Sequence, residues 1–234
     1  MNENLYIDEF TISLLHFNDP LNPIKDECGK LTWKSNYFDL SDKALIKPNG
    51  RFGNCIDLSH KSIFTAPPPE ICDNKPRTID FWFYMKDNSY KLFFCMGPDA
   101  VTGQDFGVYQ PNDGYMAIIH YYDNPGVNIP SIELNIWHHL ALVYDGTYEY
   151  LFLDGKLILK NQRNVYTPGG YLAINTQGED CDTDGEILYD EFRISSIARW
   201  TENFIPPTYP YNKTKKIFLD NQNFIYGINN NLKE

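Results

Sequence analysis

The acidic run DCDTDGEILYDE, which spans Asp180 to Glu191, concentrates carboxylates that could bind a metal ion. It matches the D-x-[DN]-x-[DN]-G-x5-E pattern of a calcium-binding loop. Glu191 follows Gly185 along a predicted strand, however, and at roughly 3.3 Å per residue it would lie about 20 Å away, too far to close the site. The shorter D-x-D-x-D-G loop still predicts a Ca²⁺ site, and its ligands would be Asp180, Asp182, Asp184 and Glu186. The alternative is a solvated acidic turn in an acidic protein.

Two tyrosine-rich stretches, GVYQPNDGY and HYYDNPG, carry the side chains that sugar binding needs. A sugar presents one apolar face and a rim of hydroxyls, so it binds aromatic rings with amides and carboxylates nearby. The expected carbohydrate-binding residues are Tyr109, Gln110, Asn112, Asp113 and Tyr115 in the first stretch, and Tyr121, Tyr122, Asp123 and Asn124 in the second. If the strands expected on either side form a hairpin, the two stretches lie at its opposite ends, and at most one serves a given pocket. The alternative is that these tyrosines cover sheet edges.

The bulk composition excludes several classes of partner. The chain has 234 residues, a formal net charge of -11 and a pI near 4.8. Nucleic acids and anionic membrane surfaces would therefore repel it. No apolar stretch approaches the roughly 20 residues of a membrane span, and no N-terminal segment has the pattern of a secretion signal. We expect a protein that is made in a cytosol, binds no nucleic acid and does not insert into a membrane.

Apolar and polar side chains alternate along much of the chain, and no window shows a helical period, which predicts an all-β fold. Asp145-Gly146 and Asp154-Gly155 separate alternating runs and predict tight hairpin turns, because type I′ turns need positive φ at both central residues. A meander of at least three strands is therefore expected here. The expected strands are 12–17, 56–58, 78–84, 91–96, 106–109, 115–121, 137–144, 148–153, 171–175 and 187–194. The expected loops or linkers, rich in Pro, Asn or Lys, are 48–54, 65–78 and 203–216.

Six motifs in a fixed order carry a family resemblance. They are LLHFND (14–19), RFGNCIDL (51–58), RTIDFWFY (77–84), IWHHLALVYDG (136–146), LFLDGKLI (151–158) and GEILYDEFRISSIARWTENFIPPTYPY (185–211). Together they resemble the laminin-G-like domains of the concanavalin A-like lectin/glucanase superfamily. The resemblance implies a jelly-roll β-sandwich of two antiparallel sheets. The version with the A-R-[YW]-T…P-P ending resembles modules of bacteriophage tail and virion proteins.

The resemblance also implies a division of the chain. Residues 14–211 would form the laminin-G-like domain, residues 1–13 an N-terminal strand extension, and residues 212–234 a C-terminal extension able to form a short hairpin. The start of the chain, LYIDEFTIS, echoes the closing strand, ILYDEFRIS. The two strands could be neighbours in one sheet, or the first could be the remnant of a lost preceding module.

The family pattern assigns roles to several aromatic and histidine residues. It places Trp82, Trp137 and His139 in the sandwich interior as packing and hydrogen-bonding residues. Trp200 and Tyr211 would fasten the trailing segment back onto the sandwich.

Catalysis is not expected. Glucanases of the superfamily carry E-x-D-x-E on one face of a strand, and glycoside hydrolysis needs two carboxyl groups at a defined separation. Here Glu186 and Asp190 would share a face, but Leu188 stands where the middle Asp is expected.

These patterns favour a non-catalytic carbohydrate-binding or adhesion module of a phage virion, in a tail fibre, a baseplate or a surface decoration, that binds a host-surface glycan. The alternative is a structural or decoration protein that docks on other virion subunits through its N- and C-terminal extensions, and a glycoside hydrolase comes third. The protein would be made in the host cytoplasm and act outside the cell as part of the virion. The oligomeric state stays open, a homo-oligomer included.

Overall fold

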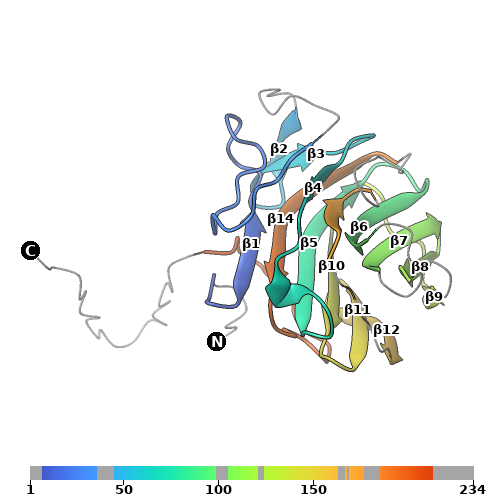
Figure 1. Ribbon diagram of the computed structural model, residues 1–234. Coiled ribbons are helices and arrows are strands. Elements are labelled where there is room, and N and C mark those ends of the chain that lie inside the picture. The colour runs from blue at the N-terminus through green and yellow to red at the C-terminus, as the bar shows by residue number, and fades with distance from the viewer. Residues whose placement is uncertain are drawn as a thin grey trace, which may run out of the picture.

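Two antiparallel β-sheets pack face to face in the computed structural model, which describes residues 7–35, 45–98, 105–120, 124–162, 167, 169–176 and 185–212 (Figure 1). The larger sheet contains, in spatial order, β12 (Lys156–Gln162), β11 (Tyr148–Leu153), β10 (Trp137–Tyr144), β5 (Arg77–Met85), β14 (Ile187–Ser195), β3 (Gly53–Asp57) and β2 (Ile46–Gly50), with β1 (Thr11–Leu15) also paired to β14. The smaller sheet contains β4 (Ile63–Thr65), β13 (Tyr171–Ile174), β6 (Lys91–Gly97), β7 (Phe106–Asn112), β8 (Tyr115–Ile118) and β9 (Gly126–Asn128). This confirms the predicted all-β sandwich.

Alternation along β5 shows why these segments form a sandwich. Ile79, Phe81 and Phe83 point toward the smaller sheet and belong to the main apolar core. Phe81 meets Phe94 of β6 with ring centroids 5.9 Å apart. The intervening residues of β5 therefore face the other way, because successive side chains of a strand point to opposite faces. We call the side of each sheet that faces the other sheet its inner face, and the opposite side its outer face.

A β-bulge interrupts β14, where the sequence predicts a regular strand. The pairing with β5 shifts register between Asp190 and Arg193, and Glu191 has a φ of 53°. The extra residue lets both Tyr189 and Phe192, three apart, reach the inner core. It also leaves Asp190 and Arg193 on the outer face.

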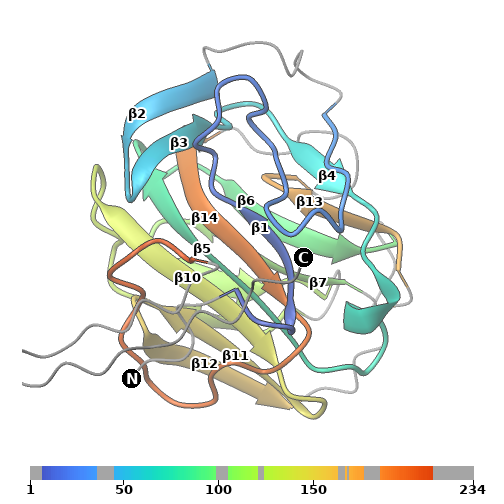
Figure 2. The ribbon, with the colours of Figure 1, turned by 90° about the vertical axis from the view of Figure 1, so that its left-hand side faces the viewer.

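The echo between the two ends of the chain is explained by strand pairing. β1 lies antiparallel to β14, with Thr11 opposite Ser195 and Leu15 opposite Phe192, and Figure 2 shows the two strands side by side. Both strands contribute apolar side chains to the same core, Ile12 and Leu15 from β1 and Phe192 and Ile194 from β14. The reading of the echo as sheet neighbours is confirmed.

The segment after β14, residues 196–212, turns back over the outer face of the larger sheet (Figure 2), and we call it the strap. Its Trp200 and Phe204 rings stack on each other at 3.9 Å. They cover Ala141 and Phe152, outer-face residues of β10 and β11, and form a second apolar cluster. The larger sheet is therefore buried on both faces, and the predicted fastening of the strap by Trp200 is confirmed.

Several boundaries differ from the sequence prediction. The predicted loop at 48–54 is the end of the β2–β3 hairpin, and β2, β4 and β9 were not predicted, because short edge strands carry little alternation. Trp82 and His139 are buried, but on the outer face rather than between the sheets, and Trp137 is only half-buried. The strap covers His139 with Trp200 and Phe204, and Phe52 of the β2–β3 hairpin packs against Trp82. Among the described residues, no helix is long and apolar enough to cross a membrane.

Candidate functional site

The first candidate site lies on the outer face of the smaller sheet, over β6 to β9. Tyr109 of β7 stands opposite Leu92 of β6 and Ala117 of β8. Its ring is 6.3 Å from that of Tyr90, centroid to centroid, and both rings are half-buried. We call Tyr90, Tyr109, Tyr115 and Asn124 the tyrosine face. It offers aromatic surface beside an amide, the combination that sugars require.

Asn124 joins the two tyrosine-rich stretches. Its Nδ2 donates to the Tyr109 hydroxyl at 3.2 Å, and its Oδ1 accepts from the His120 backbone N–H at 2.5 Å. β7 and β8 do form the expected hairpin, but Tyr109 lies with the second stretch rather than at the turn of the first. The expectation that the two stretches are separate is wrong for this residue, because an outer-face side chain of β7 reaches the end of β8.

The residues at the hairpin turn are held by other contacts. Both carboxylate oxygens of Asp113 accept from the Ser131 hydroxyl at 2.8 Å, and Asn112 is exposed. The Tyr115 hydroxyl lies against Gly126 of β9, where any side chain would collide with it.

Gln110 is fully buried, and neither end of its amide has a hydrogen-bond partner. Its prediction as a sugar-binding residue is corrected, because β-strand alternation turns it away from the outer face. Three further predicted residues lie outside the described part of the chain: Tyr121, Tyr122 and Asp123.

The predicted calcium ligands Asp180, Asp182 and Asp184 also lie outside the described residues, and only Glu186 can be placed. Its carboxylate is half-exposed and 3.5 Å from the ammonium of Lys86. The neighbouring Gly185 lies against the buried ammonium of Lys91, which is paired with Asp87 at 2.5 Å. Within the described ranges, no three His, Cys, Asp or Glu side chains gather as a metal site requires. The described end of the loop, Gly185 and Glu186, thus lies beside the lysine side chains of Lys91 and Lys86.

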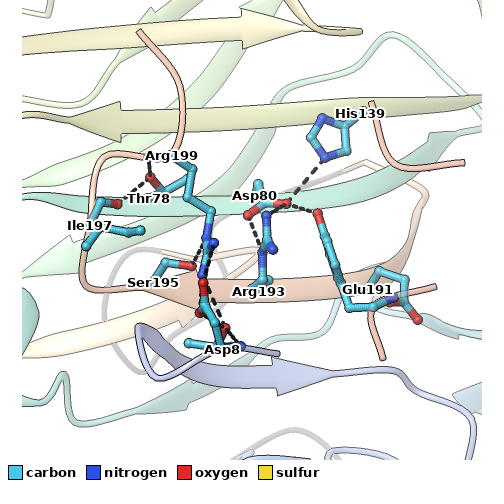
Figure 3. A network of polar contacts seen from close by, with 11 residues as sticks. Asp8, Thr78, Asp80, His139, Glu191, Arg193, Ser195, Ile197 and Arg199 are labelled. Carbon is cyan, nitrogen blue, oxygen red and sulfur yellow. Dashed lines mark hydrogen bonds and ion pairs between the residues drawn. The ribbon is translucent and has the colours of Figure 1, made fainter. Parts of the chain in front are cut away.

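The second candidate is a buried polar network between the larger sheet and the strap (Figure 3). Asp80 of β5 accepts from Arg193 of β14 at 2.9 Å and from the Tyr211 hydroxyl of the strap, and His139 Nε2 lies 3.4 Å away. Burial alone would raise the pKa of Asp80, but the Arg193 guanidinium, followed by His139 and Tyr211, outweighs it and lowers that pKa to about 2. Asp80, His139 and Arg193 are all fully buried.

Arg199 extends this network to the start of the described chain. Its guanidinium donates to both oxygens of Asp8, at 2.8 and 3.1 Å, and to the Ser195 hydroxyl at 2.6 Å (Figure 3). The Thr78 hydroxyl donates to the Ile197 carbonyl at 2.7 Å. The contacts of Tyr211, Arg199 and Ile197 therefore join the strap to β5, β14 and the N-terminal segment, whereas Arg193 and His139 link β14 and β10 to Asp80 of β5. The network fastens these segments, and we assign it no ligand.

The two carboxylates considered for glycoside hydrolysis lie in different environments. Glu186 is exposed to solvent, whereas Asp190 is fully buried beneath the β2–β3 hairpin and accepts from the Phe52 backbone N–H at 2.8 Å. Burial, and then the neighbouring Glu191 carboxylate, raise the pKa of Asp190 to about 8. Leu188 stands between the two positions on the strand. A pair in which one carboxyl is sealed from solvent does not flank a substrate.

The sequence analysis missed Tyr90, a residue of the tyrosine face, and His120, which supports that face. Tyr90 precedes β6 in a stretch without a strong motif, and the His120 backbone N–H anchors Asn124. His120 also ties the face to the larger sheet, because its Nε2 lies 2.9 Å from the buried Glu149 of β11. Only a pairing between distant strands brings these residues together, so no local spacing could have indicated them.

Residues 59–203, more than half of the chain, match the profile described as the concanavalin A-like lectin/glucanases superfamily (Laminin_G_3). A search of curated protein sequences finds no match.

Solved structures share the fold at low identity. The binding domain of botulinum neurotoxin serotype D has 13% identity and a TM-score of 0.59 over 80% of this chain and 48% of that chain. The binding domain of Paraclostridial Mosquitocidal Protein 1 has 15% identity and a TM-score of 0.60 over 81% and 49%. This chain thus spans about half the length of these two domains. Domain 4 of AbnA, a GH43 extracellular arabinanase from Geobacillus stearothermophilus in complex with arabinotriose, has 19% identity and a TM-score of 0.58 over 80% and 93%.

Proposed function

Because the chain belongs to the concanavalin A-like lectin/glucanase superfamily, we propose that it is a non-catalytic module that binds a surface glycan through its tyrosine face. The observation that carries the proposal is the contact between Tyr109 and Asn124. It sets an aromatic ring and an amide side by side on an outer sheet face that the strap does not cover.

The chemistry of the face fits a sugar better than a reaction. Tyrosine rings supply flat apolar surface, and their hydroxyls, with the Asn124 amide, supply hydrogen-bond donors and acceptors for sugar hydroxyls. No carboxylate pair suited to hydrolysis lies on this face in the described residues. The relatives point the same way, since two are toxin binding domains and one is a domain in complex with arabinotriose.

Sugar binding by such a face would be weak for one copy, and many copies on one particle would raise the avidity. The setting we propose is a phage virion, in which this module would contact the host surface. The support for this setting is the sequence ending ARWTENFIPP, which resembles virion modules.

A screen of the purified protein against bacterial surface polysaccharides tests the glycan proposal. Tyr109→Ala should abolish binding, whereas Tyr109→Phe keeps the ring, loses the hydrogen bond to Asn124, and should weaken binding several-fold. Tyr148→Ala is the matched control, since Tyr148 is a half-buried tyrosine on β11 of the other sheet. Equal losses in Tyr109→Ala and Tyr148→Ala, or no binding to any polysaccharide, would contradict the proposal.

A second candidate function is docking on other virion subunits. Apolar side chains of the strap are exposed, Ile205 by 75% and Tyr209 by 58%. The Ile7 N–H donates to the Asn212 carbonyl, so the two ends of the described chain lie side by side. Removal of the residues after Tyr211 separates the two functions, because lost assembly with intact glycan binding would support docking.

A further inference from the structure

A pocket of about 450 Å³ lies at the β4 edge of the smaller sheet, on the opposite edge from β9. Three segments far apart in the sequence line it: the loop before residue 35, β4, and the start of β13. We propose that this pocket binds a carboxylated saccharide. Lys30 and Lys34 would bind its carboxylate, and Tyr171 would pack against its sugar ring. Its volume falls in the range of small-molecule pockets, about 300 to 1,000 Å³. The site is separate from the tyrosine face and does not depend on it.

The charge of the pocket opposes that of the whole protein. The chain carries a net charge of -11, yet two lysines line this pocket, and the described lining residues include no Asp or Glu. Lys30 Nζ donates to the Thr11 carbonyl at 2.9 Å, which fixes the ammonium and leaves two further N–H donors. Lys34 is exposed. Two lysines that line one concave site favour an anionic ligand.

The loop that carries both lysines is held rigidly by Asp26. One oxygen of its carboxylate accepts from the Ser13 hydroxyl and from the backbone N–H groups of Leu14 and Cys28, at 3.0 to 3.1 Å. The other accepts from the backbone N–H groups of Lys30 and Leu31, at 2.8 and 2.9 Å. The loop is therefore ordered before any ligand binds, which lowers the entropic cost of binding.

The far wall of the pocket is equally fixed. Lys34 and Phe64 exchange backbone hydrogen bonds at 2.8 and 2.9 Å, which attaches the loop to β4. The Thr65 hydroxyl donates to the Thr32 carbonyl at 3.0 Å. The Phe64 ring meets the ring of Tyr171 edge-on at 6.1 Å.

This wall distinguishes a sugar from a simple anion. The half-buried Tyr171 and the exposed Thr32 both line the pocket, so an aromatic and a hydroxyl-bearing residue stand beside the two lysines. An inorganic anion would use the lysines alone, whereas a uronic or sialic acid residue would also stack its apolar face and use the hydroxyls.

Calorimetry with matched acidic and neutral sugars tests the proposal on the full chain. The probes are a galacturonate trimer, a hyaluronate tetramer and sialyllactose, each with its carboxyl-methylated counterpart, and sodium sulfate. We expect at least one acid to bind and its methyl ester to bind about tenfold more weakly or worse, because the charge-assisted hydrogen bonds are lost.

Three variants locate the site. Lys34→Gln should weaken acid binding about tenfold, and Ala66→Trp should block the pocket without changing its charge. Lys156→Gln, an exposed lysine on β12 of the other sheet, removes the same charge elsewhere and should have no effect. Tyr109→Ala should also leave acid binding unchanged, which keeps this site distinct from the tyrosine face.

Several results would overturn the proposal. These are no acid binding to the wild type, equal binding of acids and esters, equal losses in Lys34→Gln and Lys156→Gln, or sulfate binding as tightly as the acids. Circular dichroism should show an unchanged fold in Lys34→Gln, a surface substitution. If Ala66→Trp is not folded, Lys34→Gln and Lys156→Gln decide the question.

Discussion

Asp80 and Arg193 face each other on neighbouring strands, with Arg193 Nε 2.9 Å from Asp80 Oδ1, and the strap seals both side chains from solvent. The Arg193 guanidinium also lies 3.8 Å from the centre of the Tyr211 ring. A buried ion pair is costly to break, because the remaining charge is left without a partner in a medium of low polarity. The attachment of the strap therefore depends on this pair.

We expect Asp80→Asn to lower the free energy of unfolding by about 3 to 5 kcal/mol, measured by urea denaturation. Asp57→Asn is the control, because Asp57 is partly exposed and its ion pair with Lys86 is 3.6 Å long, and it should cost about 1 kcal/mol or less. A double variant, Asp80→Asn with Arg193→Met, should lose less free energy of unfolding than the two single variants lose in sum. Equal costs for Asp80→Asn and Asp57→Asn would show that the pair does not hold the strap.

The raised pKa of Asp190, about 8 against a usual value of 3.8, predicts a pH dependence of stability. The folded state binds the proton of the Asp190 carboxyl more tightly than the unfolded state does. The resulting contribution to the free energy of unfolding is fully present below about pH 4 and is lost as the pH rises to about 8. Across that window the free energy of unfolding of the wild type should fall by up to about 1.4 kcal/mol per pH unit relative to that of Asp190→Asn, because the asparagine side chain cannot ionise. Parallel stability curves for the two proteins between pH 5 and about 8 would contradict this assignment.

The turn at Gly155 predicts a specific effect of added side-chain volume. Gly155 has a φ of 74°, and a Cβ there would lie 2.0 Å from the Phe204 carbonyl oxygen of the strap. Gly29 has a similar φ of 66° with nothing within 4 Å, so Gly29→Ala should cost only the backbone strain, about 1 to 2 kcal/mol. Gly155→Ala should cost clearly more, and hydrogen exchange should show faster opening of the strap alone. Similar effects of the two substitutions would mean that the strap yields freely.

The acidic loop remains a prediction for calcium. Calcium at about 100 times its dissociation constant should raise the free energy of unfolding by about 2.7 kcal/mol, and a chelator should remove that gain. Asp182→Ala should make the melting temperature insensitive to both. A wild-type melting temperature that does not respond to calcium or chelator would favour the solvated turn instead, consistent with the lysines that meet Glu186 and Gly185.

Much of the fold could be predicted from the sequence, because local alternation carries the information. Ile79, Phe81 and Phe83 mark one face of β5 without reference to any other strand. The Asp154-Gly155 turn is likewise local, since it depends on the positive φ of two adjacent residues. These features predicted most of the strands and the β11–β12 hairpin, and the family resemblance added the two-layer sandwich.

The bulge at Glu191 could not be predicted from local alternation in the sequence. A single extra residue in β14 sends Asp190 and Arg193 to the outer face, and only the pairing with β5 reveals it. Trp82 and His139 are correspondingly buried beneath the hairpin and the strap rather than between the sheets. Their burial depends on how distant segments fold back, which alternation does not encode.

The two candidate ligand sites divide in the same manner. The sequence by itself determined the sandwich and marked Tyr109 and Asn124 as side chains suited to sugars. Only the tertiary structure decided that these two meet, that Gln110 is turned inward, and that Lys30 and Lys34 share a pocket with Tyr171. Strand identity follows from contacts near in the sequence, whereas a binding site is assembled from residues that are distant in the chain and meet only when the sheets pack.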